Sequence, residues 1–285
     1  MLCLWPVKVG TTGPFSCGKC LSCRINRRRD WTARLLLHHC GHVGSSAWVT
    51  LTYSDGWLPV ENGFAVLSRV DSKNFIQRFR REVLDLRYVL VGEYGDDKMR
   101  PHYHALLWYS DHEACAEWLV KRCWREGFVS VGDVNSDTIQ YTISYILKRM
   151  VSPEDERLEG RVPEFARYSH GLGVPALREL KRMGRVNSDG CFELPREFRV
   201  EGKLWPIPKY VRRKLEEEGY VFTRVALEAE EEAFVSALRS NPGAAPWDSI
   251  LEFRQAVREE VVGRRSRARI RAARGLIGRR KYETL

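Results

Sequence analysis

The sequence predicts an α+β fold, in which a central antiparallel sheet is flanked by helices and followed by a mostly helical C-terminal extension. The first 150 residues hold four stretches rich in β-branched and aromatic residues, and helical stretches do not alternate strictly with them. Beyond Val151 the pattern is punctuated by Pro and Gly until helical spacing returns at residues 207–218, 225–240 and 246–262. Hydrophobic residues make up 44% of the 285 residues, which is enough for a buried core.

Local signals give the order of elements in the first 150 residues. Strands are predicted over residues 47–53, 88–93, 102–109 and 128–134, the middle two joined by a polar turn into a hairpin. Helices are predicted over residues 21–40, from 71 to beyond 83, 111–124 and 136–150. Asp71 is the predicted N-cap of the second helix, and Asn135 or Ser136 of the fourth.

The net charge of +10 favours a polyanionic partner, nucleic acid before a membrane surface, although a basic protein can also lack such a partner. No run of about 18 apolar residues predicts a membrane span, and the first residues lack the pattern of a secretory signal. The eight cysteines are therefore expected to be reduced thiols, some of them metal-bound, rather than disulfides.

His102 and His104 lie two apart on a predicted strand, so both side chains point to the same face. A His-x-His pair alone is weak evidence, because many such pairs are incidental. Glu93 ends the partner strand of the predicted hairpin and offers a third ligand. Two imidazoles and a carboxylate suit Mn²⁺ or Mg²⁺ with positions open for phosphate oxygens, and they also suit zinc.

Tyr141, Tyr145 and Lys148 share one face of a predicted helix at i, i+4 and i+7. A core-facing aromatic stripe is the alternative, but an aliphatic stripe elsewhere on the helix is the better core face; it consists of Ile139, Ile143, Ile146 and Met150. A tyrosine needs activation to attack a phosphodiester, and a metal that polarises the phosphate and a nearby lysine would supply it. The combination predicts transesterification through a phosphotyrosyl intermediate.

Three motifs in the same chain order resemble those of rolling-circle replication initiators of the His-hydrophobic-His endonuclease superfamily, two-tyrosine type. They are Val49-Thr50-Leu51-Thr52, His102-Tyr103-His104, and the helix from Tyr141 to Lys148 with its Tyr-x₃-Tyr-x₂-Lys spacing. More narrowly, residues 1–175 resemble the initiators of gokushovirus-like microviruses, the similarity being carried by CGKCLSCRINRRRDW, VTLTYSDGWLP, GEYGDDKMRPHYHALLW and YTISYILKR.

The resemblance implies an enzyme that nicks a single-stranded DNA origin, leaves a 5′-phosphotyrosine and a free 3′-hydroxyl, and later rejoins the displaced strand. It implies Tyr141 and Tyr145 as alternating nucleophiles with Lys148 as their electrostatic partner, and His102, His104 and Glu93 as ligands of Mn or Mg. The partners would be host polymerase and, because no Gly-x₄-Gly-Lys-Ser/Thr loop is present, a host helicase in the bacterial cytoplasm. The expected segments are a Cys-rich segment with a basic helix (1–45), an endonuclease core (46–175), a helical region (176–262) and a basic tail (263–285).

Four thiols near the N-terminus could surround one structural zinc ion; they are Cys3, Cys17, Cys20 and Cys23. Their spacing differs from the usual pair of separated Cys-x₂-Cys motifs, and partly buried free thiols are the alternative. The helix that follows carries a basic cluster that is either a solvated face or a contact for the DNA backbone; it consists of Arg24, Arg27, Arg28 and Arg29. The tail, with nine basic residues between Arg264 and Lys281, is expected to bind DNA or to dock as a helix.

Two competing functions fit the same residues. One is a transposase or plasmid-mobilisation nickase of the same superfamily, with the same chemistry on another DNA. The other is a zinc-stabilised, sequence-specific DNA-binding protein without nuclease activity, in which the His and Tyr residues only pack. Metal-dependent nicking separates the second from the enzymes.

Overall fold

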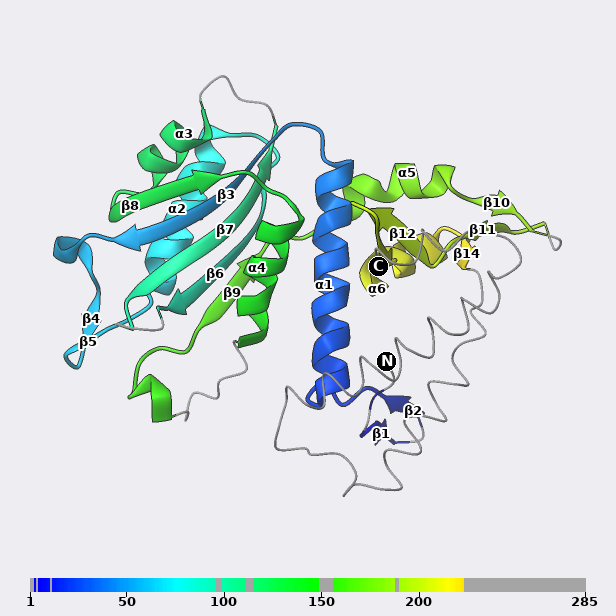
Figure 1. Ribbon diagram of the computed structural model, residues 1–285, viewed down its shortest axis with the longest axis horizontal. Helices are drawn as coiled ribbons and strands as arrows, with labels where there is room; N and C mark the ends of the chain where they lie inside the picture. Colours follow the sequence, from blue (N-terminus) through cyan, green and yellow to red (C-terminus); the bar gives the residue numbers. More distant parts are fainter. Residues whose placement is uncertain are drawn as a thin grey trace, which may run out of the picture. The chain divides into compact units, whose positions relative to one another are not determined.

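A computed structural model of the 285-residue chain describes residues 3, 5–10, 12–95, 99–110, 115–148, 156–187 and 190–222. The chain divides into two compact units, one formed by residues 1–27, 199–204 and 223–285, the other by residues 28–198 and 205–222. The second unit holds the central sheet (Figure 1). Helices predicted beyond residue 222 and the basic tail lie outside the described residues.

Five antiparallel strands form the central sheet in the order β8-β3-β7-β6-β9, which confirms the predicted α+β class. Their bounds are β3 Ser45–Tyr53, β6 Arg87–Tyr94, β7 Pro101–Tyr109, β8 Gly127–Gly132 and β9 Phe165–Tyr168. The predicted hairpin is the β6–β7 pair at the centre of the sheet. β9 was missed because its four residues, Phe-Ala-Arg-Tyr, are too few to give a clear alternation.

One face of the sheet packs against α2 (Arg69–Glu82) and α3 (Ala116–Cys123). Odd-numbered residues of β3 and β7 contribute to this core, from Ala47 to Tyr53 and from Tyr103 to Tyr109. They meet Phe75 and other apolar residues of the two helices. Because the side chains of a strand alternate, the even-numbered residues of β3 and β7 point to the other face.

The opposite face is covered by α4 (Ser136–Lys148), which contacts β6 and β7 (Figure 1). The C-terminal part of α1 (Leu21–Gly41) also lies there, since His38 packs edge-on against the ring of Trp108 with centroids 4.8 Å apart. β6 is therefore buried on both faces from Tyr88 to Tyr94. The double coverage explains why its sequence is apolar almost throughout.

Two predicted helix starts need correction. The N-cap of α2 is Ser68, whose hydroxyl accepts a hydrogen bond from the Asp71 amide; the Asp71 carboxylate instead accepts a hydrogen bond from Tyr53. α3 begins at Ala116 rather than at 111, since Cys115 has extended backbone. Asn135 does cap α4, because its side chain accepts hydrogen bonds from the amides of Asp137 and Thr138.

The remaining described elements are short. The N-terminal unit contains β1 (Val7–Val9) and β2 (Thr12–Phe15), which form a two-stranded sheet. After β3 come β4 (Val60–Glu61) and β5 (Phe64–Ala65). Residues 177–222 contain α5 (Leu177–Arg182), α6 (Lys209–Glu217) and the strands β10 (Arg185–Val186), β11 (Phe192–Leu194), β12 (Glu197–Val200), β13 (Lys203–Pro206) and β14 (Val221–Phe222). No helix among the described residues is both long and apolar enough to cross a membrane.

Candidate active site

The register of the β6–β7 hairpin brings Glu93, His102 and His104 together on one face of the sheet. Glu93 lies directly opposite His102, and His104 follows two residues later on the same face. Oε1 of Glu93 lies 2.6 Å from Nε2 of His102 and 3.1 Å from Nε2 of His104. The ligand atoms of the three side chains all lie within 4.8 Å of one another. The structure thus places the three predicted ligands in one cluster.

Each imidazole is oriented by a second contact through its other nitrogen. Nδ1 of His102 lies 3.2 Å from the backbone carbonyl of Arg100, so it acts as the donor there. Nδ1 of His104 lies 3.0 Å from the hydroxyl of Thr50, its direct partner across β3 and β7. Such outer contacts fix the ring and leave Nε2 to bind a metal. Thr50 belongs to the Val49–Thr52 motif, but its contact with His104 could not be read from the sequence.

The cluster is buried and charged. Glu93 and His104 are 3% and 4% exposed, and His102 is partly buried. Burial opposes ionisation of Glu93, yet the hydrogen bonds from His102 and His104 outweigh it and lower the pKa of the carboxyl group. Burial likewise opposes the charged form of His102, but the hydrogen bond to Glu93 raises the pKa of that imidazole. A carboxylate kept ionised in a buried site needs nearby positive charge, which a bound cation supplies.

α4 places both predicted tyrosines over the histidines. Ile139 and Ile143 are fully buried, as expected for the aliphatic stripe, whereas Tyr141 is 43% exposed. The Tyr145 ring stacks on His104, with centroids 5.3 Å apart and an angle of 16° between the planes. The Tyr141 ring meets His104 edge-on at 5.2 Å and meets Tyr145 at 4.8 Å.

Trp48 extends this aromatic group and was not assigned a role from the sequence. Its ring lies parallel to that of His104 at 6.0 Å and edge-on to Tyr141 at 5.8 Å. Trp48 and Thr50 lie on β3 two residues apart, so both point to the face that carries His104. That alternation, combined with the expected pairing of this strand, is the signal that could have identified both residues.

The other predicted site residues have separate positions. Lys148 is the last described residue of α4, and its side chain lies outside the described part. Arg24 and Arg27 belong to the N-terminal unit, at the start of α1, where Arg27 is exposed. Arg29 forms an ion pair of 3.7 Å with Glu197 within the larger unit, so its charge is partly compensated. The four N-terminal cysteines gather in a cluster of their own.

Comparison with known proteins agrees with this arrangement. Residues 46–150, which include β3, β6, β7 and α4, match the family described as Replication-associated protein ORF2. No solved structure gives a significant match to the chain.

Three viral proteins are similar over longer stretches. The chain is 28% identical to the replication-associated protein ORF2 of Spiroplasma virus 4, over 71% of this chain and 68% of that protein. It is 25% identical to the replication-associated protein VP4 of Bdellovibrio phage phiMH2K, over 69% of this chain and 65% of that protein. The replication-associated protein ORF4 of Chlamydia phage 1 is 27% identical over 48% of this chain and 39% of its own length.

These relatives confirm the resemblance to rolling-circle replication initiators of small phages that the motifs predict.

Proposed function

We propose that this chain is a replication initiator that nicks single-stranded origin DNA through a tyrosine and a divalent metal ion. The single observation that carries the proposal is the placement of two tyrosine rings, within 5.3 Å of the His104 ring, above a cluster of two histidines and a glutamate. Its similarity to phage replication-associated proteins supports the substrate class.

The reaction is a transesterification. The hydroxyl oxygen of Tyr141 or Tyr145 attacks a backbone phosphorus and loses its proton, while the bond from that phosphorus to the 3′ oxygen breaks. The 3′ oxygen takes up a proton and leaves as a free hydroxyl, and the 5′ phosphate remains on the tyrosine. One phosphodiester is exchanged for another, so the strand can be rejoined without an external energy source.

The residues fit a divalent cation, because two imidazole nitrogens and one carboxylate oxygen converge and both imidazoles are held by outer contacts. Bound Mn²⁺ or Mg²⁺ would polarise the scissile phosphate and neutralise the charge that develops on it. The chain positions the tyrosines beside this site, and Lys148 at the end of α4 favours the phenolate form. A free phenol with a pKa near 10 is only about one part in a thousand ionised at pH 7, so this assistance matters.

Two tyrosines allow two successive reactions. One tyrosine holds the 5′ end after the first nick while a host polymerase extends the free 3′ end and a host helicase opens the duplex. The second tyrosine cleaves the regenerated origin, and the released 3′ hydroxyl then attacks the first phosphotyrosine to close the displaced strand. Arg24, Arg27, Arg28 and Arg29, together with the basic tail, would contact the DNA backbone in the host cytoplasm.

The test uses the full chain and end-labelled single-stranded DNA from a cognate origin, with Mn²⁺ or with EDTA. The wild type is expected to give a labelled protein band on a denaturing gel in Mn²⁺ and none in EDTA. The double variant Tyr141→Phe/Tyr145→Phe should lose the band and still bind DNA. Tyr168→Phe is the matched control, because Tyr168 is similarly exposed but lies on the edge strand β9.

Three results would change the proposal. An adduct that persists in the double variant would overturn the assignment of the nucleophiles. Binding without cleavage in any metal would favour a DNA-binding protein without nuclease activity. Cleavage of transposon-end or plasmid-transfer DNA in preference to a phage origin would favour a transposase or mobilisation nickase.

A further inference from the structure

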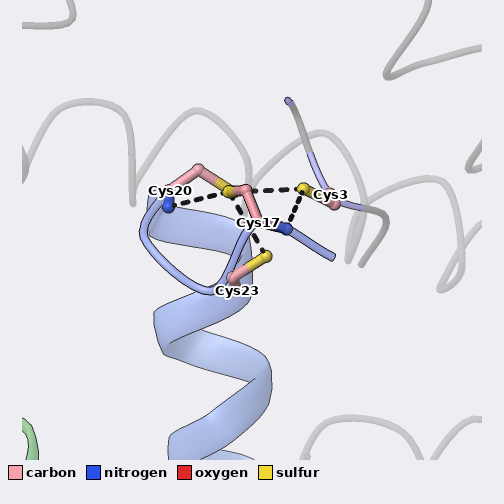
Figure 2. A group of neighbouring side chains, drawn as sticks. All are labelled: Cys3, Cys17, Cys20 and Cys23. Carbon is pink, nitrogen blue, oxygen red and sulfur yellow. Dashed lines mark hydrogen bonds between the residues drawn. The ribbon is translucent and has the colours of Figure 1, made fainter. Parts of the chain in front are cut away.

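Four of the eight cysteines gather at the N-terminal end of α1, within the N-terminal unit. Cys17 and Cys20 lie in the loop before the helix, Cys23 lies in its first turn, and Cys3 comes from the segment before β1. Figure 2 shows the four side chains converging, with their sulfur atoms turned toward a common centre. Local backbone geometry explains the convergence, because residues three apart at a helix start point the same way and Gly18 has a φ of +75° between the first two thiols.

The distances between the sulfur atoms suit one tetrahedral metal ion. Sγ of Cys3 lies 3.9 Å from Sγ of Cys20, Sγ of Cys17 lies 3.9 Å from Sγ of Cys23, and all four lie within 4.8 Å of one another. A disulfide would require about 2.05 Å, so the thiols are not oxidised pairs. Four sulfurs placed about 2.3 Å from a tetrahedral zinc ion are about 3.8 Å apart, close to the observed spacing.

Backbone amides point at two of the sulfurs. The amide of Cys20 donates to Sγ of Cys17 at 3.3 Å, and the amide of Cys17 donates to Sγ of Cys3 at 3.2 Å. Such bonds stabilise thiolates, the form that binds metal. The first turn of α1 contains no acidic residue, so the positive end of its dipole lacks a side-chain counter-charge. Four thiolates around a divalent ion carry a net charge of −2 and would provide that counter-charge.

The segment before α1 has little else to hold it. Val7, Val9 and Phe15 of the β1–β2 sheet are 48%, 65% and 49% exposed, and Trp5 is 51% exposed. Cys3 and Cys23 are by contrast buried, so the sulfur cluster is the buried centre of this segment. A segment that buries so few apolar side chains commonly depends on a metal or a disulfide for its structure.

We infer that Cys3, Cys17, Cys20 and Cys23 bind one structural zinc ion that fixes residues 3–20 to the first turn of α1. Soft thiolate ligands select zinc over the hard cations Mg²⁺ and Mn²⁺, so the site is chemically distinct from the His–Glu cluster. It leaves no ligand position open, which makes its role structural. The site also orders the helical turn that carries Arg24 and Arg27.

The test measures metal content in the full-length protein purified from zinc-supplemented cells and dialysed against EDTA. The wild type is expected to retain about one zinc ion per chain, with an X-ray absorption spectrum showing four sulfurs at about 2.3 Å. Cys20→Ser should lose most of the zinc, while Cys40→Ser, a control on the same helix, should keep it. The double variant His102→Ala/His104→Ala should also keep the zinc, which separates this site from the catalytic cluster.

Several outcomes would overturn the inference. They are a wild type with no retained zinc, iron in place of zinc, or nitrogen and oxygen ligands in the absorption spectrum. Zinc that is lost from the histidine variant but kept by Cys20→Ser would place the ion at His102 and His104 instead. If Cys20→Ser does not fold, the metal content and sulfur ligands of the wild type still decide the question. None of these measurements depends on nicking activity.

Discussion

The two faces of the central sheet use the same strands for opposite purposes. On β7, Tyr103 points into the core beneath α2, and its neighbours His102 and His104 point toward α4. The core face satisfies its polar atoms internally: the hydroxyl of Tyr103 accepts a hydrogen bond from the amide of Ser68 and donates to the Ser68 carbonyl. The α4 face instead concentrates a carboxylate and two imidazoles that suit an external ion. A single residue step along the strand therefore separates packing from chemistry.

The largest effect is expected from His104→Ala on the α4 face. The variant removes one ligand and the ring on which Tyr145 stacks. A bound metal contributes several kcal/mol to such a reaction, so adduct formation should fall by about 10³-fold. Rates of adduct formation over a range of Mn²⁺ concentrations check this, with circular dichroism to show that the fold is intact. Near wild-type rates would mean that the cluster is only structural.

Thr50→Val should have the next largest effect. Valine keeps the shape of the side chain on β3 but removes the contact with Nδ1 of His104. Loss of an outer contact typically weakens metal binding by about 10- to 100-fold. The concentration of Mn²⁺ needed for half-maximal nicking should rise accordingly, while the rate at saturating metal stays close to that of the wild type. Thr52→Val, on the same strand and face, is the control, and an equal effect there would remove the special role of Thr50.

Tyr103→Phe tests the core face and should change stability rather than metal affinity. The substitution leaves the Ser68 amide and carbonyl without their partner at the N-cap of α2. An unsatisfied buried group costs about 1–3 kcal/mol, which urea denaturation measures. Metal-dependent nicking per folded molecule should be unchanged. A loss of metal affinity without a loss of stability would contradict the separation of the two faces.

The smallest effect concerns His38, a histidine on the α4 side of the sheet that is unrelated to the metal cluster. Burial is the main cause that lowers its pKa from 6.5 to about 3, and its Nδ1 accepts a hydrogen bond from the Gly173 amide. The unfolded chain therefore binds a proton that the folded chain does not, so this group removes stability as the pH falls below 6.5. Between pH 6.5 and 5 the loss should be about 1.5 kcal/mol.

His38→Gln should flatten that pH dependence in urea denaturation curves. His170→Gln, a change at an exposed histidine, is the control and should leave the curve as in the wild type. An unchanged slope in the His38 variant would show that another group titrates.

Sequence patterns predicted the central hairpin and the metal ligands because both depend on strand alternation over short distances. They also predicted the face of α4 that carries the tyrosines, since Ile139 and Ile143 give a clear helical period. They did not predict β9 or the contacts of Trp48 and Thr50 with His104, which depend on how separate strands pair. The Ser68 cap of α2 was missed for a related reason: Asp71 had the right chemistry for a cap, but its carboxylate binds Tyr53.

The β6–β7 hairpin has a consequence for the order in which the molecule assembles. Glu93 is nine residues from His102 and eleven from His104, so a short loop closes the entire ligand set. Contacts of such low sequence separation form early in folding, whereas α4 must wait for α3 and β8 to be added. The chain can thus acquire its ion-binding capacity before it acquires its nucleophiles.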